Sequence, residues 1–240
     1  MNLSKGQILR CCFWAPLLLP HIFIFLFSGK KEVILSDLNR YSRYGIGNRV
    51  SKFIFVMAHY KEYRSLFYYR VGKWKYLLCY VPALSSLHIE TKNIGRGLFV
   101  EHGDATFIAA RSIGDNCYIN QCVTIGYSNA SDAPVLLDNV QVKAGAKIIG
   151  KVTVGNNCIV GANAVVVKDV PDNCTVVGVP AYIVKKDGIN VRMSLQTGGG
   201  GVIIVLPLTA KIEREAVHMP ESIGGMYGLS AVVRKFPMAA

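Results

Sequence analysis

A six-residue repeat is the feature of this sequence that most limits its fold. A branched aliphatic residue opens each unit, and Gly, Asn, Ala or a polar residue usually follows it. Six consecutive units run without a slip from Leu136 to Pro171. An α-helix repeats every 3.6 residues and a half-buried strand every two, so neither alone produces this period. The residues that open the units are Ile94, Ile113, Ile119, Ile125, Leu136, Val142, Ile148, Val154, Val160 and Val166.

The period predicts short strands joined by tight turns, with three strands closing one triangular coil. We expect the opening side chains to point inward and to stack on their equivalents in neighbouring coils. Gly and Asn at the corners accept the left-handed backbone conformation that a sharp turn needs. Such coils gain stability by stacking on one another. The sequence therefore predicts a mainly β solenoid over residues 86–193.

Two departures from the period draw attention to particular residues. The spacing from Val100 to Phe107 is seven, so residues 100–106 (VEHGDAT) hold one extra residue. The spacing from Ile125 to Leu136 is eleven, which predicts a loop of about five residues within 127–135. Function tends to be placed at such departures. Of the five histidines, only His102 lies inside the repeat at a departure, which makes it the candidate general base.

The repeat and its motifs resemble the hexapeptide-repeat acyltransferases, and within them serine acetyltransferase and the capsular-polysaccharide O-acetyltransferases. The resemblance implies a left-handed parallel β-helix, preceded by a helical N-terminal region over residues 1–85, that assembles as a homotrimer. It also implies acetyl-CoA as acyl donor, bound in a groove between coils. The matching segments lie between residues 88 and 186 and are 94–97 (IGRG), 101–102 (EH), 113–116 (IGDN), 121–126 (QCVTIG), 144–150 (AGAKIIG), 160–165 (VGANAV) and 178–184 (GVPAYIV).

The resemblance also implies site residues. The catalytic histidine of the family follows an acidic residue, and here that pair is Glu101 and His102. A hydroxyl attacks a thioester poorly until a base takes its proton, and histidine does this best near neutral pH. The residues expected by family position to line the CoA groove, the lysine at a phosphate, are Ala144, Gly145, Ala162 and Lys168.

The chain departs from serine acetyltransferase at three positions. Ala133 stands where that family has a second active-site histidine. The aspartate that orients the catalytic histidine would fall near Leu87, so Glu90 or His88 is a substitute by proximity. Glu101 replaces an aspartate that helps to hold the amino acid. A sugar hydroxyl on a glycan precursor therefore competes with serine as the predicted acceptor, and a non-catalytic CoA-binding module is a remote alternative.

The charge distribution bears on partners and metals. Residues 1–85 contain 13 Lys and Arg against 3 Asp and Glu, and so carry most of the net charge of +12. No helix-turn-helix, zinc-finger or RNP-like pattern accompanies this excess, which favours an anionic membrane surface or ligand over nucleic acid. The seven cysteines form no CxxC pair, as expected for reduced thiols in the cytoplasm. A zinc enzyme on these coils would need three histidines in the repeat, so we expect no metal.

An apolar run over residues 11–28 leaves several alternatives open. It is about long enough to span a bilayer, but Pro16, Pro20 and His21 within it weaken that interpretation. If the run spanned, the basic residues after it would keep the remainder of the chain in the cytoplasm. If it lay on the surface, the same charges would favour the inner leaflet, giving peripheral membrane contact. A helix buried against the protein or a neighbouring subunit explains the run equally well.

The remaining segments give weaker signals. Apolar and aromatic residues at helical spacing predict helices within residues 31–80, ended by Val81 and Pro82. No six-residue unit occurs in the tail, residues 194–240, where residues 202–206 are consistent with a strand and 212–219 with a short helix. We assign no function to this tail. The helical stripe consists of Phe53, Met57, Tyr60, Arg64, Phe67 and Val71.

Overall fold

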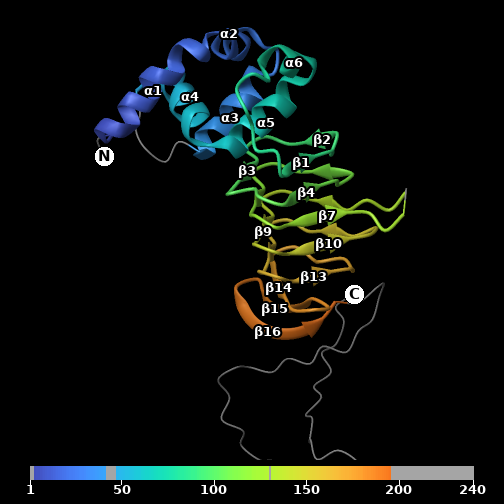
Figure 1. Cartoon of the computed structure of the whole chain (residues 1–240). Helices are drawn as coiled ribbons and strands as arrows, with labels where there is room; N and C mark the ends of the chain where they lie inside the picture. Colours follow the sequence, from blue (N-terminus) through green and yellow to red (C-terminus); the bar gives the residue numbers. More distant parts are fainter. Residues whose placement is uncertain (1–2, 42–46, 130, 196–240) are drawn as a thin grey trace, which may run out of the picture.

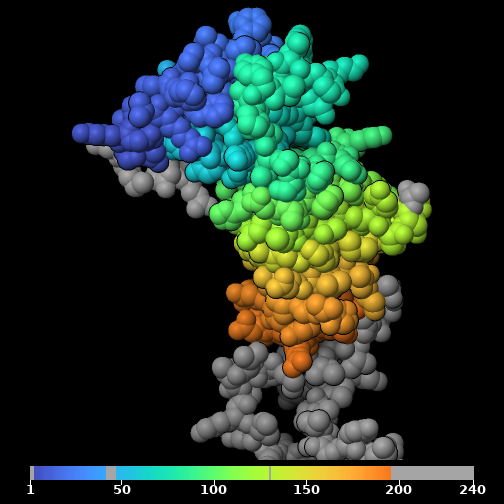
Figure 2. Space-filling model, viewed as in Figure 1, coloured from blue at the N-terminus to red at the C-terminus, as the bar shows by residue number. Residues whose placement is uncertain are grey.

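The computed structural model describes residues 3–41, 47–129 and 131–195. A head of helices sits at one end of a column of stacked β-coils (Figure 1). The space-filling view shows that the head is wider than the column (Figure 2). The strand and helix predicted for residues 202–206 and 212–219 lie outside the described residues.

The apolar run forms two helices. The first begins at a capping box in which Ser4 and Gln7 satisfy each other's backbone N–H groups. Pro16 and Pro20 flank the break at Leu18, and the two helices meet at a bend of 75°. Among the described residues no single helix is long and apolar enough to span a bilayer, although this bent pair is by length and composition. The head comprises α1 (Lys5–Leu17), α2 (Leu19–Phe27), α3 (Lys31–Tyr41), α4 (Arg49–His59), α5 (Lys61–Val71), the 3₁₀ turn η1 (Gly72–Trp74) and α6 (Lys75–Leu78).

The core of the head confirms the predicted helical region, although the stripe belongs to two helices. The chain turns at Tyr60, which ends α4 and precedes α5. Phe53 and Phe67 from the two sides of this turn are both buried, with ring centroids 5.2 Å apart. Phe25 of α2 stacks on Phe53 at 4.6 Å. One side of the apolar run therefore packs into the head.

The coils confirm the predicted left-handed parallel β-helix. Three parallel sheets form its faces. Among the described strands, antiparallel pairs occur only at the end of the third sheet, between β14 and β15 and between β15 and β16. The first sheet contains β1 (Leu87–Ile89), β4 (Thr106–Ile108), β7 (Thr124–Gly126), β10 (Lys147–Ile149) and β13 (Val165–Val166). The second contains β2 (Asn93–Ile94), β5 (Ser112–Ile113), β8 (Val135–Leu136) and β11 (Thr153–Val154). The third contains β3 (Phe99–Val100), β6 (Tyr118–Ile119), β9 (Gln141–Val142), β12 (Ile159–Val160), β14 (Cys174–Val177), β15 (Tyr182–Lys186) and β16 (Ile189–Ser194).

The residues that open the units point inward from Ile113 onward, and all of them are buried. The small or aliphatic residue at the fifth place of the units, such as Cys117 or Val140, is buried as well, except in the Ile125 unit, where the exposed Asn129 takes this place. Left-handed backbone occurs at the corners, as the Gly and Asn pattern predicts. The non-glycine corner residues include Asn116, Asn139, Asn157, Asn163 and Asn173, with φ between 56° and 58°.

One register differs from the prediction. Phe107 is 48% exposed, while Ile108 is buried and pairs in register with the inward Ile125. The spacing from Val100 to the next inward residue is therefore eight, and the step from Ile108 to Ile113 is five. The turn after β3 holds two extra residues rather than one. A shorter corner in the same coil compensates for one of them.

Side chains of α3 satisfy the upper edge of the first coil. Asp37 accepts a hydrogen bond from the backbone N–H of Leu98 (2.9 Å), and it is ion-paired with Arg70. The hydroxyl of Tyr41 lies 2.9 Å from both the N–H and the carbonyl oxygen of Val100, accepting from one and donating to the other. No coil precedes β3 in the described chain, so these contacts replace the missing strand.

Candidate active site at a corner of the coils

His102 lies in the turn from β3 to β4, directly beneath the helical head. Its φ of 65° places it in the left-handed region, which non-glycine residues occupy rarely and often at functional sites. The side chain is exposed, and no hydrogen bond joins its imidazole to another described residue. The backbone of His102 is thus held in an unusual conformation while its ring remains accessible.

The turn itself is rigidly held. Gly103 also has a left-handed φ, and a β-carbon there would lie 3.0 Å from Val100 Cγ1, so a larger residue would be strained. The carbonyl oxygen of Asp104 accepts from the backbone N–H of Cys122 in the next coil (2.8 Å), and its carboxylate accepts from Ser86 Oγ (3.0 Å). These contacts anchor the turn that carries His102.

Glu101, the other predicted catalytic residue, is engaged elsewhere. Its carboxylate accepts a hydrogen bond from the hydroxyl of Tyr118 on β6. The ring of Tyr118 in turn lies 4.3 Å from Lys143 Nζ. Glu101 is therefore adjacent to His102 in sequence, while its side chain bonds to the outer face of the third sheet.

Glu62 is the carboxylate that the sequence does not reveal. It lies in the first turn of α5, and a β-carbon at Gly103 would be 3.4 Å from the β-carbon of Glu62. Burial raises the pKa of the Glu62 carboxyl, and the charge of His102 acts to lower it. This electrostatic effect and the proximity to Gly103 place Glu62 near the candidate base. Forty residues separate Glu62 from His102 in the chain, and no motif connects them.

The residues considered as partners of His102 on the first strand lie elsewhere. Leu87 is buried and carries no polar group. His88 stacks on Phe107 across the first sheet, with ring centroids 4.5 Å apart. Glu90 follows β1 at a different corner of the coil, where its N–H bonds to the carbonyl oxygen of Ile108.

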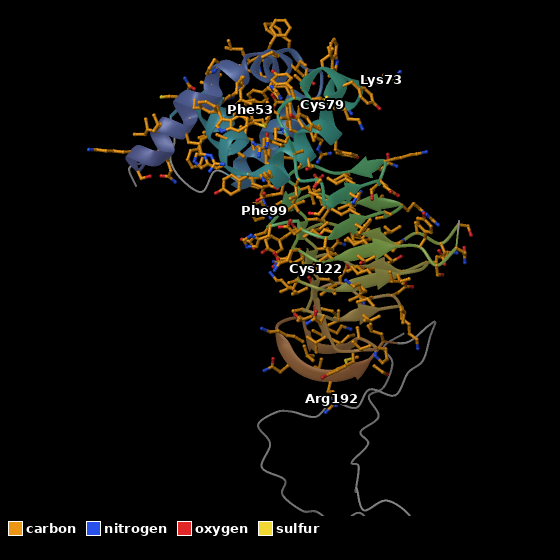
Figure 3. The ribbon with its side chains drawn as sticks, viewed as in Figure 1. Phe53, Lys73, Cys79, Phe99, Cys122 and Arg192 are labelled. Carbon is orange, nitrogen blue, oxygen red and sulfur yellow. The ribbon has the colours of Figure 1, made fainter. Side chains whose placement is uncertain are left out.

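Below the turn of His102, one corner of the column is built from small residues. Gly145 N–H donates to the carbonyl oxygen of Gln121 above it (3.0 Å), and Asn163 N–H donates to that of Ala144 (2.9 Å). Together with the bond from Cys122 to Asp104, these contacts stack four successive turns between the third and first sheets. Cys122 marks this corner in Figure 3. The predicted Ala144, Gly145 and Ala162 therefore share the corner that begins at His102.

Two lysines beside this corner were missed by the sequence analysis. Lys143 and Lys147 bracket the small residues 144–146, and Lys147 Nζ lies 2.5 Å from the carbonyl oxygen of Cys122. Lys168, predicted to meet a phosphate, follows β13 at the next corner. There it lines a cavity of about 210 Å³ with Tyr182. The structure thus separates Lys168 from the other predicted groove residues within one chain.

The predicted loop leaves the coil between β7 and β8. Asp132 folds back onto it, accepting from the N–H groups of Ser128 and Asn129 at 2.9 Å. A hydrogen bond from the Ser128 hydroxyl and one from the Asn129 backbone lower the pKa of Asp132. Asp132 thus stabilises the loop itself, beside the half-buried Ala133.

Cysteines and other metal-ligating side chains form no site in the described part of the chain. Within residues 3–41, 47–129 and 131–195, no three His, Cys, Asp or Glu side chains are grouped to hold a metal ion. All seven cysteines are free, and Cys117, Cys158 and Cys174 are buried. Burial raises the pKa of the Cys117 and Cys158 thiols to about 11, so these groups are inert core residues.

Comparison with known proteins confirms the resemblance. Residues 133–168 match the family model described as bacterial transferase hexapeptide (six repeats). The chain is 36% identical to a serine acetyltransferase of Synechococcus elongatus over 152 residues, which cover 57% of this chain and 62% of that protein. It is 43% identical to a serine acetyltransferase of Staphylococcus aureus (strain Mu50) over 102 residues, covering 41% of this chain and 48% of that protein.

Solved structures agree with these sequence matches. The crystal structure of a serine acetyltransferase from Brucella abortus strain S19 superposes with a TM-score of 0.55 and 27% identity, covering 70% of this chain and 74% of that chain. The alignments with the curated relatives span about half to three-fifths of those proteins' lengths.

Proposed function

We propose that this chain, a hexapeptide-repeat protein resembling serine acetyltransferase, is an acetyl-CoA-dependent O-acetyltransferase with His102 as its general base. One observation carries the proposal. The strained, accessible His102 stands at the head of a corner of small residues flanked by lysines. Acyl transfer from a long thioester donor requires a base beside a groove that is lined by small side chains.

In this proposal His102 takes the proton of the acceptor hydroxyl as that hydroxyl attacks the thioester carbonyl. A positioned base of this kind accelerates transfer by roughly 10²–10⁴-fold. Glu62 is a positioning residue, because a carboxylate beside an imidazole orients the ring and stabilises its charged form. Backbone N–H groups at the coil corners are the candidate donors to the negative charge that develops on the carbonyl oxygen.

Acetyl-CoA would lie along the corner that contains Ala144, Gly145 and Ala162. The chemistry of this corner fits such a donor: its side chains leave room for a pantetheine arm, and Lys143 and Lys147 offer charge to phosphates. We further propose that the protein is a cytoplasmic homotrimer, in which a neighbouring subunit covers the open side of the corner. In a trimer, Lys168 can serve the groove of an adjacent subunit.

The favoured acceptor is a hydroxyl of a glycan precursor, with L-serine as the competing candidate. A small zwitterion needs charged partners that replace its lost water. Here Leu87 and Ala133 carry no charge, and Glu101 is bonded to Tyr118. A sugar hydroxyl needs only the base and a few neutral hydrogen bonds. The relatives named serine acetyltransferase favour L-serine, so the two kinds of acceptor must be compared directly.

The base is tested with His102→Ala and the matched control His88→Ala, an exposed histidine on the first sheet. Thiol release from acetyl-CoA is followed with a panel of L-serine and mono- and oligosaccharide acceptors. His102→Ala should lose about 10²–10⁴-fold in kcat with CoA affinity unchanged, while His88→Ala remains active. Near wild-type turnover by His102→Ala removes it from the mechanism. CoA binding without turnover of any acceptor identifies a non-catalytic module.

The acceptor is tested by comparing kcat/KM for L-serine with kcat/KM for the sugars at saturating acetyl-CoA. We expect the sugars to react more efficiently. Serine turnover near the roughly 10⁴ M⁻¹s⁻¹ of ordinary substrates, with inert sugars, would show that serine is the acceptor despite Leu87, Ala133 and Glu101.

A further inference from the structure

The helical head carries many exposed apolar side chains that the coils do not cover. Two segments far apart in the chain carry them: α1 with α2, and η1 with α6. Of these, α2, η1 and α6 line a cavity of about 420 Å³, with Phe23, Phe27, Trp74 and Leu77 among its lining residues. A hydrogen bond from the Tyr80 hydroxyl to a carbonyl of α1 joins the two segments. We call these exposed side chains the apolar face; they are Leu9, Phe13, Leu19, Phe23, Phe27, Trp74, Tyr76 and Leu77.

The exposure of this face is not a consequence of loose packing. Leu18 at the bend, His21 and Phe25 of α2 and Leu78 of α6 are all buried in the head, whereas α1 has no fully buried residue. The His21 ring lies 3.1 Å from the Tyr68 hydroxyl, and burial lowers its pKa to about 4, so it is neutral. Phe27 is nevertheless 73% exposed and Trp74 58% exposed. Helices that are apolar on both sides are covered by something other than water.

The charges around the apolar face are all of one sign. Neither residues 3–31 nor residues 63–89 contain an Asp or Glu. The first acidic residue after the apolar run, Glu32, lines a separate cavity with Arg96 and Asp115 of the coils. Figure 3 shows Lys73 extending from the head. The basic side chains on the segments that form the face are Lys5, Arg10, Lys30, Lys31, Lys73 and Lys75.

This charge pattern indicates what kind of partner binds the apolar face. A second copy of the chain docked through the same face would bring these cations together in a low-dielectric contact, which is unfavourable. An anionic lipid surface meets both needs, because its headgroups attract Lys and Arg while its acyl boundary accepts Phe, Leu and Trp. Aromatic residues such as Trp and Tyr are typical of this boundary.

The geometry indicates helices that lie on the bilayer. At 1.5 Å per residue, α1 and α2 are about 20 Å and 14 Å long, each shorter than the roughly 30 Å hydrocarbon core. Their bend of 75° and the packing of His21 and Phe25 into the head hold them along the surface of the protein. An in-plane helix inserts only its outer side, to a depth of about 5–10 Å.

We propose that the apolar face docks peripherally on a bilayer containing anionic lipids. The inserting side chains are those of α1, α2, η1 and α6, and the lysines around them contact the headgroups. This proposal concerns binding alone and stands whether or not acetyl transfer is the activity.

The test is flotation of the full chain with vesicles of phosphatidylcholine alone or mixed with phosphatidylglycerol. We expect binding to the mixed vesicles, weakened by salt, with a blue shift of tryptophan emission that is reduced in Trp74→Tyr, in which Trp14 is the remaining tryptophan. Phe27→Asp should weaken binding at least about tenfold, the worth of one buried Phe. Lys73→Glu should weaken it about thirtyfold, since it changes two charges at roughly 1 kcal/mol each.

The matched control is Ile189→Asp, which places the same charge at a 67% exposed position on β16, at the far end of the column (Figure 1). This variant should bind like the wild type. The proposal is overturned if the chain binds neither vesicle, if Ile189→Asp and Phe27→Asp lose binding equally, or if the phosphatidylcholine vesicles bind as tightly as the mixed ones. A smaller mass of Phe27→Asp by light scattering without lipid would instead identify the face as a contact between copies.

Discussion

Removal of the Asp37 carboxylate should separate the helical head from the coils. Asp37 and Arg70 are both buried, with Arg70 Nε 2.8 Å from Asp37 Oδ2. Arg70 also donates to the carbonyl oxygens of Ile94 and Gly95 at 2.7 and 2.6 Å, and Asp37 accepts from Leu98 N–H. Two helices and the first coil thus depend on one ion pair.

The magnitude follows from what Asp37→Ala leaves behind. The guanidinium of Arg70 would remain buried without its counter-charge, which costs about 3–5 kcal/mol in comparable buried pairs. The double variant Asp37→Leu with Arg70→Met removes both charges. It should therefore be less destabilised than the sum of Asp37→Leu alone and Arg70→Met alone, with a coupling energy of about 1–3 kcal/mol.

The assay is equilibrium urea unfolding followed by circular dichroism. Arg96→Ala is the matched control, because Arg96 and Asp115 form an exposed pair with 66% and 36% of their side chains accessible and a 3.4 Å separation. Such a pair contributes less than about 1 kcal/mol. If Asp37→Ala costs no more than Arg96→Ala, or if the double variant is additive, the buried pair does not hold the junction.

Three further predictions concern the site and the head. Ala162→Trp should raise the KM for acetyl-CoA several-fold or more without unfolding the coil; unaltered cofactor kinetics would place the groove elsewhere. Glu62→Gln should lower kcat by about tenfold at constant KM, whereas a purely structural role would change stability and leave kcat of the folded fraction intact. His21 has a pKa of about 4 in the folded chain against 6.5 ordinarily, because burial disfavours its charged form. Between these two pKa values the unfolded chain binds one more proton than the folded chain. The free energy of unfolding is therefore highest above about pH 6.5 and falls by up to ~3 kcal/mol towards pH 4. In urea titrations at pH 7 and pH 5, His21→Gln should flatten this pH dependence, and an unchanged slope would refute the prediction.

The coils were predictable because their period is a property of consecutive residues. An inward aliphatic residue at every sixth position forces the same side chains to stack, wherever the rest of the chain lies. The register at Phe107 was not predictable on that basis. One extra residue in the turn after β3 is offset by the shorter corner between Ile108 and Ile113. Only the burial of Ile108 shows that this residue, and not Phe107, points inward.

The site was predictable only in part, for a related reason. His102 could be identified from the sequence because it lies where the six-residue repeat is interrupted. Glu62 does not, because its approach to the turn depends on how α5 packs on the first coil, a contact between segments that no local pattern encodes. Lys168 illustrates a different limit of the sequence. A position matched by family order lies at a separate corner of this chain, since sequence order does not state which corner a residue faces.

The contacts of α3 with β3 have a consequence for truncated forms of this protein that lack the helices. A solenoid has two open ends, and each is a row of unpaired backbone groups able to recruit another strand. At one end the hairpin of β15 and β16 closes the third sheet; at the other, Asp37 and Tyr41 occupy the bonding positions of Leu98 and Val100. A fragment without its helices would therefore expose unpaired backbone groups at one end only, and we expect two such fragments to associate through that end.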